Sequence, residues 1–569
     1  MNSKWPAAPT AASLDDPRYY LANFRCLLEW VAACYDDLLS DAERAFMRDV
    51  LDLPVPAQAL LVRMVMRRGE TFRAARLDYA EIGDTAAALA PLVVSGWVEE
   101  DPLLSLDELF RHWRLAELRT ALAGDIRAAG LPASTGKARL REALAARLVE
   151  PRRLTQWWPE APDRIVRITC MDHCERLRLM FFGNLRQDWA DFVLAELGMQ
   201  RYERVPLDPA SRAFQRRAEV DAYRHLHQLR ERLDVGESAD SLWPEVAASG
   251  SDEVWDSPWL ATRRARLLFQ LGREAERHGN QTLALEAYTE SARDPGGGGE
   301  ARIRRLRLLE RLGESRDALT LAEAQPSRSD AEGQALARLV PRLRRRLGLA
   351  VQPPPPAPDI EHWTLTLPEP AVGVEVAVRD HLQRTECPVH YVENALIGGL
   401  FGLLCWEAIF APLPGAFFHP FQRGPADLRR EDFVGRRRER FDVCLAQLEE
   451  GSYAATIRRH WHTKHGLASP FVDWQVLDET LLERALACLP AAHLERLFVR
   501  LLADIGTNRA GLPDLIQFLP EATQGPRYRL IEVKGPGDRL QDNQRRWMAY
   551  FHTHGIPASV CRVRWQTPP

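Results

Sequence analysis

Three ionisable side chains near the end of the chain lie where a strand would normally be apolar. The segments GLPDLIQFLP and YRLIEVKG are typical of two strands joined by a turn, and they carry Asp514, Glu532 and Lys534. Successive side chains alternate between the two faces of a strand, so Glu532 and Lys534 share one face. If the two strands pair, Asp514 can lie beside Glu532.

These residue types in this pattern indicate chemistry on phosphate. Buried charges without partners would cost several kcal/mol, and two neighbouring carboxylates also repel each other. A divalent cation reverses that repulsion, so the pattern predicts Mg²⁺ or Mn²⁺ held by oxygen ligands, with Lys534 beside it to orient a water or stabilise charge on phosphate. The alternative is a surface salt bridge between Glu532 and Lys534, worth at most about 1 kcal/mol. The apolar neighbours Ile531 and Val533 argue against that alternative.

The elements that must position these residues predict an α/β domain. After the second strand, LQDNQRRWMAYFHTHG places Gln544, Trp547, Met548 and Phe551 on one stripe of a helix, and ASVCRVRW follows as another strand. A hairpin, a crossover helix and a further strand form the core of the restriction-endonuclease-like fold. Further upstream, the apolar run in ALIGGLFGLLCWEAIF ends at Glu407, short of the roughly 20 residues that span a bilayer, and predicts a buried helix.

The preceding part of the chain is expected to be mostly helical, in a multidomain α+β protein. Residues 1–105 predict helices and a short β element, which fits either a winged-helix unit or a plain helical domain. Residues 166–350 predict mixed helices followed by pairs of the tetratricopeptide type, with arginines in RIRRLRLLERL and RLVPRLRRRLGL that either line a phosphate-binding groove or cover solvated helix faces. The proline-rich residues 351–365 predict a linker, and residues 366–569 the final α/β domain.

Residues 106–165 predict a two-helix unit with a basic turn. Gly130 and Pro132 end the first helix, and Ser134 or Thr135 can cap the second. The segment resembles a SAP module, a small DNA-binding unit, although an ordinary solvated hairpin is the alternative. The DNA-binding interpretation rests on basic side chains at or near the start of the second helix, where backbone N–H groups favour phosphate: Lys137, Arg139 and Arg141.

The spacing of PD and EVK is that of the PD-(D/E)xK nucleases. Together with YVENALIGGLFGLLCWEAIF, HGLASPFVDW, YYLANFRCLLEWV and GNLRQDWADFVL, it makes the chain resemble bacterial members of the Fanconi-associated nuclease family, whose last domain is a VRR-NUC nuclease. The resemblance implies that Asp514 and Glu532 are the catalytic, metal-binding carboxylates, and that Lys534 is the catalytic lysine. It also implies a metal ligand in the Val533 carbonyl.

Two further site residues come from the same resemblance. Glu393 matches an additional catalytic and metal-binding glutamate presented from the helix before the sheet; without the family it would be interpreted as a charge favoured at a helix N-terminus. Gln544 matches a glutamine of the crossover helix, for which a catalytic and a structural role are both open.

The resemblance implies a structure-selective, divalent-metal-dependent DNA endonuclease with a preference for 5′ flaps. It also implies 5′→3′ exonuclease activity of the phosphodiesterase I type, releasing 5′-phosphate products, and a role in DNA repair that includes interstrand crosslinks. The expected partner is branched or 5′-flap DNA, and the expected cofactor is Mg²⁺ or Mn²⁺. Two alternatives stay open: a Holliday-junction-resolvase-like nuclease, which would require a symmetric dimer, and a catalytically inactive DNA-binding or interaction scaffold.

Composition restricts the remaining classes. The chain has 569 residues, 46% hydrophobic and 27% charged, which is typical of globular domains, and its net charge of -4 neither indicates nor excludes nucleic-acid binding. Its 9 cysteines contain no CxxC pair, so we expect a reducing compartment and no ubiquitin-binding zinc finger. With no apolar leader at the start, we expect a cytoplasmic protein that associates with the nucleoid when bound to DNA and not with a membrane.

Two histidine-containing motifs also carry side chains that could bind a ligand. CMDHC offers Cys170, His173 and Cys174 on one helical turn, but no second ligand pair follows, so zinc is not favoured. RRHWHTKHG is interpreted as a source of phosphate contacts or as a solvated loop.

Overall fold

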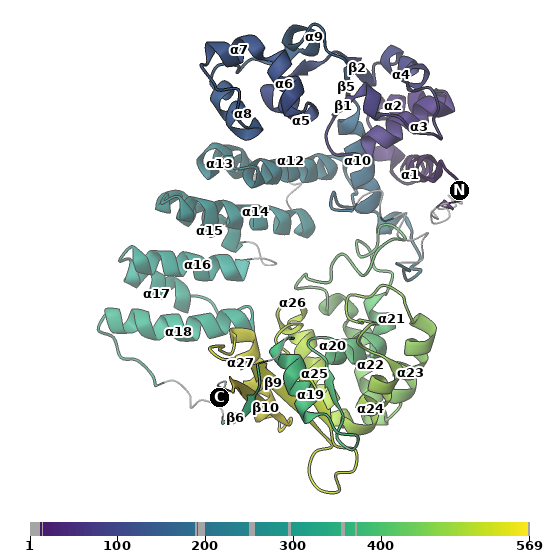
Figure 1. Ribbon diagram of the computed structural model, residues 1–569. Coiled ribbons are helices and arrows are strands. Elements are labelled where there is room, and N and C mark those ends of the chain that lie inside the picture. Colours follow the sequence, from purple (N-terminus) through teal and green to yellow (C-terminus); the bar gives the residue numbers. More distant parts are fainter. Residues whose placement is uncertain are drawn as a thin grey trace. The chain divides into compact units, whose positions relative to one another are not determined.

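The computed structural model describes residues 12–13, 15–187, 191, 200–249, 257–293, 298–353, 359–369 and 372–566 (Figure 1). The chain forms two compact units. The first comprises residues 1–200, 207–220 and 418–421, and the second comprises residues 201–206, 221–417 and 422–569. The proline run at residues 354–358 lies outside the described ranges, as do residues 188–190 and 192–194 of the segment 183–194 that contributed to the resemblance.

The first unit begins with helices and a small antiparallel sheet. The sheet has the order β1-β5-β2, and its middle strand β5 pairs antiparallel with both neighbours. This wing favours the winged-helix interpretation over a plain helical domain. The elements are α1 (Tyr19–Tyr35), α2 (Asp41–Asp52), α3 (Val55–Val65), β1 (Thr71–Arg73), α4 (Thr85–Val94), β2 (Val98–Glu100) and β5 (Ile165–Ile168), followed by α10 (Met171–Phe182).

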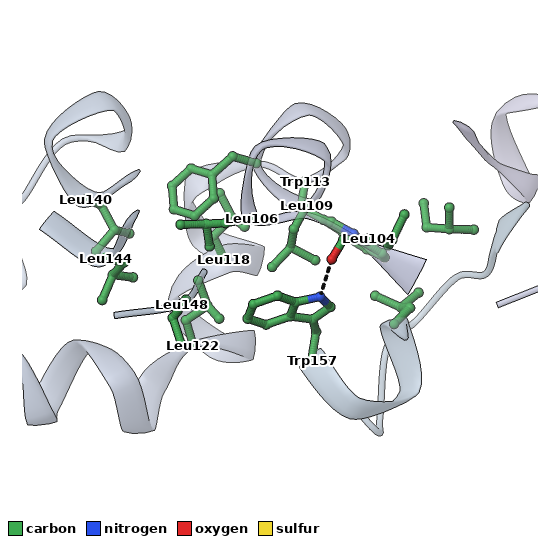
Figure 2. Packing of buried hydrophobic residues seen from close by; sticks show 13 residues of the cluster. Leu104, Leu106, Leu109, Trp113, Leu118, Leu122, Leu140, Leu144, Leu148 and Trp157 are labelled. Atoms are coloured by element: carbon green, nitrogen blue, oxygen red, sulfur yellow. Dashed lines mark hydrogen bonds between the residues drawn. The ribbon is translucent and has the colours of Figure 1, made fainter. Parts of the chain in front are cut away.

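Between β2 and β5 the chain leaves this sheet to form the two-helix unit. Its own core is a cluster of leucines and tryptophans, in which Trp157 Nε1 donates to the Leu104 carbonyl at 3.0 Å (Figure 2). The elements are β3 (Leu103–Leu104), α5 (Leu106–His112), α6 (Leu115–Ala121), α7 (Ala123–Ala128), α8 (Lys137–Ala145), β4 (Arg152–Arg153) and α9 (Leu154–Trp157), with β3 and β4 paired.

The prediction that Ser134 or Thr135 caps the N-terminus of α8 is wrong. Gly136 is the N-cap and offers no side chain, while the Thr135 hydroxyl donates instead to the Pro132 carbonyl at 2.7 Å. The turn is therefore closed on itself before the helix begins. That closure leaves the first N–H groups of α8 without a side-chain cap.

The second unit opens with stacked helix pairs, as predicted (Figure 1). A close contact fixes one pair: a Cβ added to Gly272 on α14 would lie 2.7 Å from the Tyr288 ring on α15, so the site requires glycine. The helices are α12 (Arg217–Asp234), most of which belongs to this unit, α13 (Ala239–Ala248), α14 (Pro258–Arg277), α15 (Gln281–Arg293), α16 (Gly298–Arg311), α17 (Ser315–Glu323) and α18 (Asp330–Arg346).

The rest of the second unit contains a five-stranded sheet of order β6-β10-β9-β8-β7. β10 runs parallel to β6 and β9, whereas β8 is antiparallel to β9 and β7. The hairpin, crossover helix and parallel strand thus confirm the restriction-endonuclease-like core. The elements are β6 (Glu361–Leu367), α19 (Val374–Leu382), β7 (Val389–Tyr391), β8 (Leu515–Phe518), β9 (Tyr528–Lys534), α27 (Asp542–Thr553) and β10 (Ala558–Trp565).

One part of the predicted linker belongs to the sheet. Residues 361–365, assigned to the proline-rich linker, lie in β6 and pair with β10 from Ser559 onward. Most β6 side chains are exposed or half-buried, because β6 is an edge strand. Its sequence therefore lacks the apolar signal of a buried strand.

A helical insertion separates β7 from β8. Every residue of its first helix, α20, is buried, as the sequence predicted. None of the described helices is both long and apolar enough to cross a membrane. The helices are α20 (Leu396–Leu404), α21 (Trp406–Ile409), α22 (Arg438–Glu450), α23 (Tyr453–Lys464), α24 (Glu479–Cys488), α25 (Ala491–Ala503) and α26 (Ile505–Asn508).

Candidate active site

The β8–β9 hairpin brings Asp514 and Glu532 together. The register pairs Leu515 with Ile531, so Asp514, directly before β8, reaches the end of the pairing beside Glu532. Asp514 is 7% exposed, and its Oδ2 accepts a hydrogen bond from the Val533 N–H at 2.8 Å. The predicted strand pairing is confirmed, and the backbone of one strand fixes the carboxylate of the other.

Glu532 is fully buried in the middle of β9. Nζ of Lys534, on the same face, lies 2.6 Å from its Oε1, and Oε2 has no hydrogen-bond partner among the described residues. A buried carboxylate oxygen without a partner is costly in a folded protein. The geometry therefore leaves one strong acceptor of this site unsatisfied.

Both carboxyl groups titrate far from their ordinary range. The pKa of Glu532 is raised to about 7, mainly by burial and also by the negative charge of Asp514, against the opposing effect of Lys534. Burial likewise raises the pKa of Asp514 to about 6, while the Val533 N–H and Lys534 lower it and Glu393 raises it. Two neighbouring acids whose pKa values are raised by burial and by nearby negative charges form a site that gains by binding positive charge.

Glu393 lies in the turn between β7 and α20, so the prediction that a helix presents it is wrong. Its carboxylate accepts hydrogen bonds from the Tyr391 hydroxyl and, at 3.4 Å, from Asn394 Nδ2. The Val392 N–H donates to the Asp514 carbonyl at 2.8 Å, which anchors the turn to the start of β8.

Glu393 is thus near the two buried acids but engaged elsewhere. Its negative charge raises the pKa values of Asp514 and Glu532. Within the described ranges, no three acidic, histidine or cysteine side chains are gathered closely enough to hold a metal ion as they stand. A metal site that uses Glu393 therefore requires its carboxylate to move closer to the two buried acids.

Gln544 is the third residue of α27, the helix that follows the loop after Lys534. Its Oε1 accepts a hydrogen bond from the Gln541 N–H at 2.8 Å, which forms a capping box. The structure therefore gives this side chain a helix-capping role, and its catalytic role stays a prediction.

A pocket of about 400 Å³ that the sequence did not reveal adjoins Glu393. Three arginines line it: Arg423, Arg429 and Arg509. Burial lowers the pKa of Arg509, and the charges of Arg429 and Arg423 lower it further, so the three guanidinium groups lie within electrostatic reach of one another. The acids Glu393 and Asp473 also line the pocket. The arginines come from separate segments, which is why no local motif marks them. A larger cavity of about 540 Å³, at the other end of β9, contains none of the site acids.

The basic residues of the two-helix unit are only partly available. Lys137 Nζ donates to the Trp113 carbonyl at 2.8 Å, and Arg141 pairs with Asp107 at 3.2 Å. Arg139 is exposed and makes no hydrogen bond or ion pair with the part of the chain that the structure describes. Of the three, Arg139 is the side chain most open to a phosphate.

The histidine motifs do not form metal sites in the described ranges. The ring of His173 stacks on Phe46, with centroids 5.4 Å apart. In the other motif, the buried His460 bonds to the Leu403 carbonyl at 2.6 Å, and Lys464 pairs with Glu203 at 2.9 Å. His460 and Lys464 thus have partners within the protein. The sequence had allowed two interpretations of this motif, phosphate contacts or a solvated loop.

Three family models match consecutive parts of the chain. They are "FAN1, HTH domain" at residues 18–99, "Fanconi anemia-associated nuclease SAP domain" at residues 103–157 and "VRR-NUC domain" at residues 448–565. A Fanconi-associated nuclease 1 homolog of Pseudomonas aeruginosa is 50% identical over 564 residues, which cover 98% of both chains. The chain belongs to the Fanconi-associated nuclease 1 family.

Other family members match with different coverage. The human Fanconi-associated nuclease 1 is 33% identical over 178 residues, 30% of this chain and 17% of the human one. A solved structure of paFAN1 bound to 5′-flap DNA with a gap matches with a TM-score of 0.91 at 49% identity, covering 98% of this chain and 100% of that one. The family models confirm the predicted winged-helix-like, SAP-like and VRR-NUC modules, and membership identifies this chain as a DNA nuclease.

Proposed function

We propose that this nuclease is a divalent-metal-dependent endonuclease that selects 5′-flap DNA, with 5′→3′ exonuclease activity that releases 5′-phosphate products. We place it in DNA repair, including repair of interstrand crosslinks. The observation that carries the chemistry is the buried pair of Asp514 and Glu532 beside Lys534, in which one carboxylate oxygen has no partner. The paFAN1 relative, solved with 5′-flap DNA, supports the choice of substrate.

The donor atoms fit Mg²⁺ or Mn²⁺. The carboxylates of Asp514, Glu532 and Glu393 and the carbonyl of Val533 are hard oxygen ligands, which these cations prefer. When bound, such a cation supplies Lewis-acid chemistry that activates water and neutralises charge on the leaving oxygen.

The chain's own residues have separable roles at this site. The Val533 N–H fixes Asp514, and β9 fixes Glu532, so both carboxylates are held in place before substrate arrives. Glu393, in the adjoining turn, joins them when its carboxylate moves toward the two buried acids. Lys534 keeps its ammonium group next to the reacting phosphate, where it orients a water or stabilises developing negative charge.

Basic residues around the active site and on the two-helix unit are proposed to select 5′-flap DNA. The arginine pocket beside Glu393 is placed to receive a phosphate of the cleaved strand, including its 5′ end, through forked guanidinium hydrogen bonds. In the two-helix unit, Arg139 at the start of α8 is proposed to contact a duplex arm, with Lys137 and Arg141 contributing if they release their internal partners.

Two alternatives are less well supported. A Holliday-junction resolvase would need a symmetric dimer, whereas this chain carries its own HTH and SAP modules to choose DNA. An inactive scaffold would have no need to keep a buried, partly unsatisfied carboxylate pair beside a lysine, because that arrangement destabilises the fold without metal.

The test is cleavage of 5′-end-labelled flap DNA with Mn²⁺. Glu532→Gln and Lys534→Ala are expected to abolish cutting while DNA binding persists, and the control Glu521→Gln, an exposed acid in the turn of the same hairpin, is expected to cut normally. Binding without cutting by the unmutated protein would contradict the metal-dependent endonuclease. Equal cutting of linear duplex and flap DNA would contradict structure selectivity.

A further inference from the structure

Most arginines of the helical repeats are neutralised within the protein. Their guanidinium groups pair with carboxylates of neighbouring helices. Most of the arginines predicted to line a phosphate-binding groove therefore already have a partner within the protein. The pairs are Arg302 with Glu332, Arg304 and Arg311 with Glu276, Arg342 and Arg346 with Glu310, and Arg344 with Glu323. Any arginine of the repeats that lacks such a pair is therefore an exception.

Two half-buried arginines are exceptions. Arg264 lies on α14, and its Nε is buried without a hydrogen-bond partner, while its Nη2 reaches only the Val246 carbonyl at 3.5 Å. Arg305 lies on α16 and has neither a hydrogen bond nor an ion pair to any described residue. Among the described residues neither guanidinium has a carboxylate ion-pair partner, in contrast to the paired arginines named above.

A third arginine adds to the same positive charge. Burial lowers the pKa of both Arg264 and Arg305, and for both the charge of Arg293, on α15, lowers it further. The nearby acid is Glu290, but it already pairs with Arg293 at 2.7 Å. The Ser291 hydroxyl donates to the Ala265 carbonyl at 2.8 Å, which fixes the end of α15 beside this part of α14.

These charges fit an external anion better than an internal role. Partial burial of a guanidinium without a counter-charge costs stability, so the arginines do not serve the fold. The forked donors of arginine match the oxygens of a phosphate diester, and contacts to the backbone hold DNA without reading its sequence. Arginines on three successive helices, α14, α15 and α16, are suited to contact an extended sugar–phosphate backbone.

We propose that Arg264 and Arg305, with Arg293 joining them when phosphate replaces Glu290 as its partner, form a phosphate-binding site on the helical repeats that holds the sugar–phosphate backbone of duplex DNA. The site rests on the proposed function, because it would grip a duplex arm of the same substrate. It is distinct from the arginine pocket beside Glu393, which lies in the nuclease domain.

The experiment compares the double variant Arg264→Gln/Arg305→Gln with a control of equal charge change, Arg277→Gln/Arg311→Gln. Both control arginines lie in the same repeats and pair with carboxylates. Binding of labelled flap DNA is measured by fluorescence anisotropy in EDTA, from 50 to 200 mM salt. Each lost phosphate contact reduces the magnitude of the slope of log affinity against log salt by about 0.9. For each contact that Arg264→Gln/Arg305→Gln removes, the loss of DNA affinity between 50 and 200 mM salt should therefore be roughly three-fold smaller than for the unmutated protein.

Two further readouts separate a DNA site from a structural one. The Arg264→Gln/Arg305→Gln variant is expected to melt at the same or a higher temperature, because it removes unpaired buried charge. Glu290→Gln, which removes the acid paired with Arg293, is expected to bind flap DNA more tightly than the unmutated protein.

The possible failures are distinguishable. A salt slope equal to that of the control would overturn the site, as would a lower melting temperature of the Arg264→Gln/Arg305→Gln variant. Stabilisation by inorganic phosphate with an unchanged DNA slope would also overturn it, in favour of a small-anion site. If the unmutated protein neither binds nor cuts flap DNA, the proposed function itself fails, whereas normal cutting with an unchanged slope refutes only this site.

Discussion

Replacing Glu532 by glutamine tests the active-site argument through stability, independently of catalysis. In the metal-free protein, Glu532 is buried with a partnerless oxygen, and its pKa is about 7. An acid whose pKa is raised by folding binds its proton more tightly in the folded state. The folded state is therefore favoured at low pH, and it loses stability as the pH rises from the ordinary value of 4.5 to about 7.

The size of this effect follows from the pKa. A rise from 4.5 to about 7 corresponds to about 3 kcal/mol lost above neutral pH, at roughly 1.4 kcal/mol per pH unit. Glutamine cannot ionise, but it leaves Lys534 without its carboxylate, so we reduce the expected gain to about 2 kcal/mol. For a domain of this size that is a melting shift of about 4–8 °C.

Metal is expected to reverse the order of the melting temperatures of Glu532→Gln and the unmutated protein. At pH 8 in EDTA, Glu532→Gln should melt above the unmutated protein, and at pH 5 the difference should nearly vanish. With Mn²⁺ at about 100 times its Kd, the unmutated protein gains about 2.7 kcal/mol that the variant cannot obtain, so it should melt higher. Differential scanning fluorimetry of the full chain, with Glu521→Gln as the matched control, follows the transition that responds to Mn²⁺.

One result would refute this reasoning. If Glu532→Gln melts below the unmutated protein in EDTA at pH 8, the pair of Glu532 and Lys534 is a stabilising structural salt bridge. The sequence-based alternative would then be correct, and the buried carboxylates would give no argument for a metal.

Three other predictions concern the two buried acids, the turn that carries Glu393 and the helical repeats. Cleavage at limiting Mn²⁺ should rise with pH to a plateau above about 7, because protons compete with metal for the two buried carboxylates, and saturating Mn²⁺ should move the rise to lower pH; a flat pH profile of initial rates would contradict this. Tyr391→Phe releases Glu393 and should lower the Mn²⁺ concentration needed for half-maximal cutting, and an increased requirement would show that the hydroxyl positions the ligand. Gly272→Ala should destabilise the repeats by about 1–3 kcal/mol in urea unfolding, because its Cβ meets the Tyr288 ring, whereas the control Gly124→Ala, in open space on α7, should be neutral or stabilising.

The sequence was most informative where the chemistry is local. Asp514, Glu532 and Lys534 lie on one hairpin, and the two-residue period of a strand is enough to place the last two on one face. Burial of Ile531 and Val533 confirms that β9 is an internal strand. The fold around it followed from the order of hairpin, helix and strand.

The rest of the site depends on contacts between distant segments. The arginine pocket draws on loops and helices that no spacing connects, and the Tyr391 hydroxyl that holds Glu393 could not be inferred from YVEN. β6 was missed because an exposed edge strand after a proline run has a weak apolar pattern. The cap of α8 was misassigned because Thr135 satisfies a nearer carbonyl.

The position of β5 has a consequence for how the SAP-like unit moves. Its chain leaves the first sheet after β2 and comes back as the central strand β5, with β3 and β4 paired where the two connections meet. The unit is therefore tethered at both ends and cannot swing from a single flexible hinge. A truncation within it would remove the middle strand of the winged-helix sheet, so the unit can be deleted or exchanged only by splicing between Glu100 and Ile165.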